Sequence, residues 1–179
     1  MKRSTLFLRF GTTAIALALS GAAMAANTDL VKPAVLVADR SLTPSQLAVM
    51  ETVARRYDTF WHTGEERLAR EALAADFVDK TPPQGRQPGP EGPLLASRAF
   101  RAAVPDLGCE IEQMIIAGDR AVVHLHFRGH FTGTFGQLKG RGQAVDFIAT
   151  DIYRIEHGKI AANWHIEDNL TLMRQLGAL

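Results

Sequence analysis

The sequence lacks most features that mark nucleic-acid-binding, zinc-binding or disulfide-stabilised proteins. Its 179 residues include one cysteine, Cys109, so a single chain cannot form an internal disulfide. No His and Cys cluster has zinc-site spacing, and no glycine-rich phosphate loop follows an expected strand. The 20 basic and 19 acidic residues nearly balance, without a dense basic patch. We therefore expect no nucleic-acid partner and no metal.

Long apolar runs are missing as well. The run at residues 12–19 follows Lys2 and Arg3 and is too short to cross a bilayer of about 30 Å. The small-x-small triplet at 23–25 is typical of a cleavage site. The pattern predicts a cleaved secretory signal peptide over 1–25, an exported periplasmic or secreted protein, and no stable membrane anchor after cleavage. A retained helix is the alternative. Without the three basic signal residues, the mature chain has 17 basic and 19 acidic residues, a net charge of −2.

Beyond the signal, the chain is long enough for one domain with a real core. Residues 26–43 contain Pro33 and no lasting periodicity, which predicts a flexible tether before a domain at 44–179. Thr43 as N-cap and Pro44 at the first position begin a helix, and Gly64 ends it. Tyr57 and Trp61 share its apolar face.

The later elements change from helices to strands. The patterns predict helices at 65–74 and 92–104, a short strand at 77–78, strands at 110–116, 121–131, 145–155 and 159–167, and a short helix at 169–176. The Pro- and Gly-rich stretch 80–93 is a surface loop and a candidate lid. Helices first and strands later indicate an α+β fold: three N-terminal helices packed on a curved antiparallel sheet, with a short C-terminal helix.

The last predicted hairpin holds the strongest candidates for chemistry. A turn centred on residues 157–158 places Asp151 opposite Trp164 and Phe147 opposite Asp168. Alternation then puts both aspartates on an apolar face, where lost hydration raises a carboxylate's pKa and suits it to acid or base catalysis. The structural alternatives are that Asp168 caps the following helix and that Asp151 makes a buried ion pair or hydrogen bond.

Other candidates come from one strand and one helix. His124, His126 and His130 alternate along residues 121–131, but neighbours two apart lie about 7 Å from each other, which disfavours a shared metal. They form a polar stripe in a pocket or at a subunit interface, and His126 is the candidate proton carrier. Tyr57 and Trp61 pack in the core or line the pocket.

An ordered set of short motifs resembles the SnoaL-like polyketide cyclase and ester cyclase group of the NTF2-like superfamily. The set runs from residue 53 to 176 and comprises Arg56-Tyr57-Asp58 with Trp61, Ala74-Ala75-Asp76-Phe77-Val78, residues 89–98, Val104-Pro105-Asp106, Gly118-Asp119-Arg120-Ala121-Val122, Gly129-His130-Phe131-Thr132-Gly133, Asp151-Ile152-Tyr153-Arg154-Ile155, Gly158-Lys159-Ile160, Trp164, Asp168 and Gln175-Leu176-Gly177. The sequence departs from the family pattern in three places: Asp79-Lys80 stands where a histidine is common, Phe131 replaces another histidine, and Ala162 replaces an acid.

The resemblance implies a cone-shaped fold with a pocket between helices and sheet, often dimeric through the sheet. It implies cofactor-independent removal of a proton next to a carbonyl and aldol-type ring closure or a related lyase or isomerase reaction, on a small apolar or aromatic ligand. Asp168 matches the family's acid, with Asp151 or His126 as the second polar group. The expected substrate-binding residues are Tyr57, Trp61, Phe131, Phe147, Tyr153 and Trp164. A non-catalytic periplasmic ligand-binding protein or dimeric interaction protein on the same fold is the alternative.

Overall fold

The computed structural model describes residues 30–179. The predicted signal peptide and the first residues of the predicted tether lie outside this range, so cleavage and export stay predictions. Within it, no helix is both long and apolar enough to cross a membrane.

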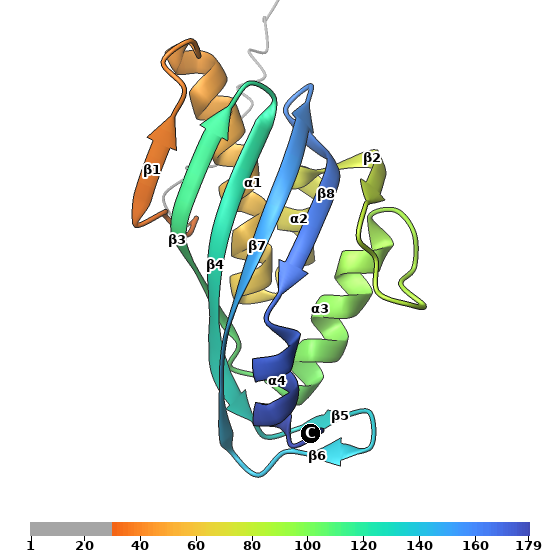
Figure 1. Cartoon of the computed structure of the whole chain (residues 1–179). Helices are drawn as coiled ribbons and strands as arrows, with labels where there is room; N and C mark the ends of the chain where they lie inside the picture. Colours follow the sequence, from red (N-terminus) through yellow and green to blue (C-terminus); the bar gives the residue numbers. More distant parts are fainter. Residues whose placement is uncertain (1–29) are drawn as a thin grey trace, which may run out of the picture.

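The helical layer consists of α1 (Pro44–Thr63), α2 (Glu66–Ala72) and α3 (Glu91–Ala103). Local chemistry fixes the ends of α1 as predicted. The Thr43 side chain accepts a hydrogen bond from the Gln46 backbone N–H, the Gln46 side chain accepts one from Thr43 N–H, and Gly64 ends the helix at a φ of 78°. The face of α1 that carries Tyr57 and Phe60 is buried against the sheet. In Figure 1 these helices lie on one side of the strands.

The sheet has six strands in the order β1-β3-β4-β7-β8-β2 and is open at both edges. Its members are β1 (Val35–Ala38), β2 (Leu73–Asp79), β3 (Gly108–Ala117), β4 (Arg120–Phe131), β7 (Gln143–Glu156) and β8 (Lys159–Glu167). A small hairpin of β5 (Thr134–Phe135) and β6 (Leu138–Lys139) occupies the glycine-rich stretch between β4 and β7. The last helix, α4 (Asn169–Leu176), packs at the same end of the molecule as this hairpin (Figure 1).

Two edge features differ from the expectations. Residues 35–38, expected in a flexible tether, form strand β1, which pairs in parallel with β3. This pairing supplies backbone partners that no local periodicity reveals. Strand β2 also pairs in parallel, with β8, so the sheet is antiparallel only through its four central strands.

A β-bulge in β8 sets the register that matters for the site. Next to the 157–158 turn, Ile155 pairs with Ile160, but Arg154 pairs with Ala162, so Ala161 has no partner of its own. The extra residue shifts the remaining pairs by one, and a one-residue shift moves every following side chain to the opposite face. Asp151 therefore lies opposite His165, and the predicted pairing of Asp151 with Trp164 is wrong.

Candidate active site

A cavity of about 920 Å³ lies between α1, α3, α4, strands β7 and β8, and the loop at 80–90. This volume lies within the range of small-molecule sites. Most of its wall is aromatic or aliphatic, from Tyr57, Trp61, Phe77, Leu95, Phe100, Phe127, Phe135, Phe147, Ile166, Leu172 and Met173. Its polar lining includes Asp79, Arg86, Asp151, Asn163, His165 and Glu167.

The aromatic wall is held by ring contacts that join α1, β4, β7 and α3. Phe127 stacks on Phe147 with ring centroids 5.1 Å apart, and Trp61 meets the edge of Phe127 at 6.5 Å. Phe100 meets Phe147 edge to face at 5.9 Å. Because these rings support one another from separate elements, the wall offers flat, rigid surfaces to an apolar or aromatic ligand.

The polar part of the cavity is built on the shifted register. Asp151 on β7 is 2% exposed, and its Oδ1 accepts a 2.6 Å hydrogen bond from Asn163 Nδ2. His165 Nδ1 lies 3.0 Å from the same oxygen, and His165 Nε2 lies 3.3 Å from Glu167 Oε2. Both contacts to Asp151 use Oδ1, so its Oδ2 has no protein donor among the described hydrogen bonds. A carboxylate, an imidazole and a second carboxylate thus form one chain on the cavity wall.

The protonation state of His165 follows from its two neighbours. Burial alone would lower the pKa of His165. The hydrogen bonds and charges of Asp151 and Glu167 outweigh this effect and raise the pKa to about 10. At neutral pH the ring is therefore an imidazolium whose two N–H groups face carboxylates. In this state His165 can donate a hydrogen bond to a ligand oxygen.

Tyr57 provides a second hydrogen-bond donor, which is neutral. Burial and the negative charge of Asp151 raise the pKa of its phenol, while the positive charge of Arg86 lowers it. The raised pKa keeps the Tyr57 hydroxyl protonated at any physiological pH. Asp151 and Arg86 line the same cavity as this phenol.

Residues 51–176 match the family model of the SnoaL-like polyketide cyclases. The chain belongs to this family. The match covers most of the described residues, and it includes Asp151, His165 and Glu167.

Solved structures agree with the assignment to the SnoaL-like family. A protein from Bacillus cereus named as a polyketide cyclase is 38% identical over 85% of this chain and 96% of its own, with a TM-score of 0.76. TsrD from Streptomyces laurentii is 28% identical over 77% of this chain and 99% of its own, with a TM-score of 0.68. IdmH from Streptomyces antibioticus is 23% identical over 72% of this chain and 98% of its own, with a TM-score of 0.64, and supports the fold. The comparison with curated proteins gave no match. The predicted NTF2-like α+β fold of the SnoaL-like group is confirmed.

Four of the nine residues expected at the site line the cavity of this SnoaL-like fold: Tyr57, Trp61, Phe147 and Asp151. The other five lie elsewhere. Phe131 is fully buried in the core, and Tyr153 is fully buried and donates a 2.7 Å hydrogen bond to Asp58. Trp164 faces away from the cavity because of the bulge, and the Arg120 guanidinium lies 5.6 Å from its ring.

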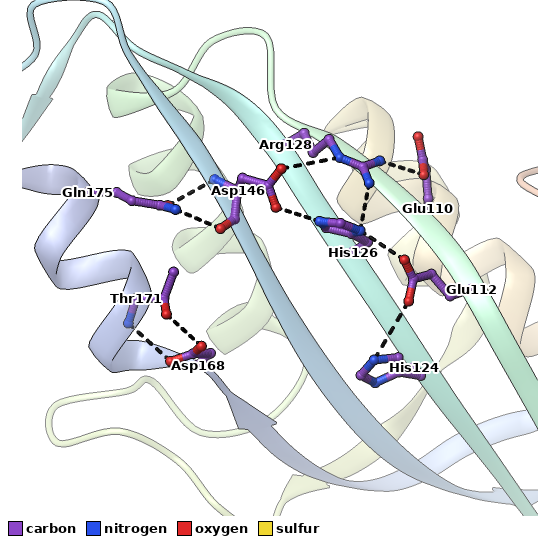
Figure 2. A network of polar contacts seen from close by, with 9 residues as sticks. All are labelled: Glu110, Glu112, His124, His126, Arg128, Asp146, Asp168, Thr171 and Gln175. Atoms are coloured by element: carbon purple, nitrogen blue, oxygen red, sulfur yellow. Dashed lines mark hydrogen bonds and ion pairs between the residues drawn. The ribbon is translucent and has the colours of Figure 1, made fainter.

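Asp168 lies outside the cavity wall and caps α4. Its Oδ1 accepts a 3.0 Å hydrogen bond from Thr171 N–H, and its Oδ2 accepts a 2.7 Å bond from the Thr171 hydroxyl (Figure 2). These hydrogen bonds hold the pKa of Asp168 below its usual value. The structural alternative described above, a helix cap, accounts for all of these contacts. The predicted opposition of Asp168 and Phe147 is wrong, because Ala149 already pairs with Glu167.

His126 belongs to a charged network on the outer face of the sheet, away from the cavity (Figure 2). Its ring nitrogens contact Glu112 and Asp146, and the hydrogen bond to Asp146 contributes most to raising its pKa. Arg128 joins the same network. Within residues 30–179, no three His, Cys, Asp or Glu side chains are placed to hold a metal ion. Dimerisation through this face stays a prediction.

The sequence did not identify the polar residues of β8 that line the cavity. Asn163, His165 and Glu167 alternate along the strand, but the regular register placed them on the face opposite Asp151 and placed Trp164 on the same face as Asp151. The available signal was the pair Ala161-Ala162, two small residues in succession that are both buried. Such a break in alternation is typical of a bulge, and bulges often occur beside active sites.

Proposed function

We propose that this SnoaL-like protein is a cofactor-independent enzyme that removes a proton next to a carbonyl group of a small apolar or aromatic compound. The proposal extends to an aldol-type ring closure or a related isomerisation or lyase reaction. The observation that carries it is the Asp151–His165 contact of 3.0 Å on the wall of an aromatic cavity. Membership of the SnoaL-like polyketide cyclase family supports this reaction class.

Each residue has a separate task in the proposed reaction. Asp151 Oδ2 takes the proton from the carbon next to the ligand carbonyl, and the electron pair moves onto the carbonyl oxygen. The imidazolium of His165 donates a hydrogen bond to that oxygen, exchanging its longer contact with Glu167 for the ligand. Developing charge on the oxygen is thereby stabilised by a donor that the protein holds in place.

Ring closure then needs no further reagent. The nucleophilic carbon of the enolate attacks a second carbonyl of the same molecule, and a carbon–carbon bond forms. The resulting alkoxide takes back the proton that Asp151 holds, so protons and electrons balance without a cofactor. Trp61 and Phe147 hold the ligand rings while the enolate carbon approaches the second carbonyl carbon.

Hydrogen–deuterium exchange tests the proton-transfer step. We expect the wild-type protein to accelerate exchange of the carbonyl-adjacent hydrogens of 2-tetralone in D₂O, followed by NMR. Asp151→Asn should bind the ketone but lose acceleration by about 100-fold or more. Asp168→Asn is the matched control and should exchange at the wild-type rate.

The same experiment separates the enzyme from a ligand-binding protein. Binding of 2-tetralone by the wild type with exchange at the buffer rate supports the non-catalytic alternative. Equal acceleration by wild type and Asp151→Asn would remove Asp151 from the mechanism.

A further inference from the structure

Arg86 is a partly buried cation in the cavity wall that the proposed reaction does not use. It lies on the loop between β2 and α3, where its backbone N–H donates a 3.0 Å hydrogen bond to Pro83 O. Its side chain passes close to Gly92, where an added Cβ would lie 3.2 Å from Arg86 Cδ and 2.2 Å from Gln87 O. The glycine therefore gives the loop and the Arg86 side chain room at the start of α3.

The guanidinium of Arg86 is poorly satisfied for its burial. Its side chain is 23% exposed, and its one described ion-pair partner is Asp79, with Nη1 3.9 Å from Oδ2. That separation is beyond hydrogen-bond range. Arg55 shows the usual arrangement: its side chain is 10% exposed, and it donates hydrogen bonds to Val31 O, Leu30 O and Glu51 at 2.8–3.1 Å. Arg86 therefore has donors left for a ligand.

Arg86 is the one cation of the described cavity lining without a hydrogen-bonded carboxylate, which leaves it available to an anionic ligand group. Arg86 and His165 are the two cavity-lining residues with positive charge among those described, and His165 is held between Asp151 and Glu167. Asp79 is held on its other oxygen, because Oδ1 accepts a 3.0 Å hydrogen bond from Thr81 N–H. The planar fork of a guanidinium matches a carboxylate in a bidentate pair, which is stronger and more directional than the present contact to Asp79.

We propose that Arg86 selects the ligand, and that the cavity takes an aromatic carbonyl compound carrying a carboxylate, which pairs with the Arg86 guanidinium. The aromatic carbonyl part of this ligand rests on the proposed function. Arg86 is a specificity residue: it anchors the charged end of the ligand, while the rings lie along Trp61 and Phe147.

A matched pair of probes tests the carboxylate preference. Anthraquinone-2-carboxylate and its methyl ester share rings and ketones and differ by one negative charge and one methyl group. Neither has a hydrogen on a carbon next to its ring ketones, so binding is measured without the proposed reaction. The Trp164→Phe background leaves Trp61, which lines the cavity, as the one tryptophan of the chain, and its fluorescence reports occupancy.

We expect the parent protein, which carries only Trp164→Phe, to bind the acid about ten-fold or more tightly than the ester, in line with a charge-assisted bidentate pair. Arg86→Met should reduce this ratio to about one while leaving ester affinity unchanged. Asp79→Asn should increase the ratio, because it removes the competing charge and keeps an oxygen for Thr81 N–H. If the Arg86–Asp79 ion pair has only a structural role, both substitutions should weaken the binding of acid and ester alike.

Three results would overturn the inference: equal affinities for acid and ester in the parent protein, a preserved preference in Arg86→Met, or no binding of either probe. The Asp79→Asn variant decides the case if Arg86→Met does not fold by circular dichroism, since an unchanged acid-to-ester ratio contradicts the proposal. Asp151→Asn should keep the full preference. A wild-type protein that prefers the acid but does not accelerate exchange contradicts the proposed function alone. A wild-type protein that accelerates exchange but binds acid and ester equally contradicts this inference alone.

Discussion

His165 Nδ1 lies 3.0 Å from Asp151 Oδ1 because one residue of β8, Ala161, bulges out of the pairing with β7. Without the bulge, His165 would point to the outer face of the sheet. The bulge thus turns a surface histidine into a partner of a buried carboxylate. It also places Glu167 on the second nitrogen, which completes the charge balance of the imidazolium.

This pair predicts a pH-dependent contribution to stability. The pKa of His165 rises from an ordinary value near 6.5 to about 10 on folding, so its stabilisation is fully present below about pH 6.5 and is lost as the pH rises through about 10. We expect His165→Gln to lower the free energy of unfolding by about 1–3 kcal/mol at pH 6, through its lost hydrogen bonds to two carboxylates, and by less at pH 10. Urea unfolding of both proteins at several pH values measures this; a difference independent of pH would contradict it.

Asp168 should act on stability and not on chemistry. Asp168→Ala removes the acceptor for Thr171 N–H and should lower the melting temperature by a few degrees. The low pKa of Asp168 means that its contribution is present above the unfolded value and is lost as the pH falls through the folded value. Exchange activity on 2-tetralone should remain. A loss as large as that of Asp151→Asn would restore Asp168 as a catalytic candidate.

The two tryptophans should respond differently to a ligand. Trp61 lines the cavity, whereas Trp164 lies on the outer face beside Arg120. We expect Trp61→Leu to weaken binding of anthraquinone-2-carboxylate methyl ester by about five-fold or more, since it removes an aromatic contact. Trp164→Phe should leave the affinity unchanged. Isothermal titration calorimetry measures both, and an equal effect of the two substitutions would argue against the placement of the ligand.

The helices could be predicted from the sequence because their signals are local. Thr43, Pro44 and Gly64 specify the ends of α1 within a few residues, and the limits of α4 at 169–176 follow from its cap and Gly177. The parallel edge strand β1 could not be predicted, since its partner lies in β3, more than 70 residues away.

The site was predictable only in part. Tyr57, Trp61, Phe147 and Asp151 were placed correctly because helical and strand periodicity suffices on α1 and β7. The failure on β8 has one physical cause. A regular two-residue alternation puts Trp164 inside and His165 outside, and a single unpaired residue reverses both. The rule that apolar residues are buried favoured the register that places Trp164 inside. A row of polar side chains inside is stable only when its charges are paired, and this pairing could not be read from the sequence.

Asp58 offers a test of the buried contact between α1 and β7. Its side chain is fully buried, its Oδ1 accepts the 2.7 Å hydrogen bond from Tyr153, and its Oδ2 has no partner among the described residues. Burial raises the pKa of Asp58 well above its usual value, against the opposing effect of the Tyr153 hydrogen bond. The raised pKa favours the protonated, neutral form of Asp58.

A raised folded pKa means that the folded state holds a proton that the unfolded chain releases above about pH 4. The wild-type protein should therefore lose stability relative to Asp58→Asn as the pH rises from 4 to 8, because the amide has no proton to lose. Tyr153→Phe removes the hydroxyl donor to Asp58 and should cost about 1–3 kcal/mol. Urea unfolding of the three proteins at pH 4, 6 and 8 measures these differences. Parallel pH curves for wild type and Asp58→Asn would show that Asp58 is ionised in the folded protein, and a cation or ordered water would then be needed beside Oδ2.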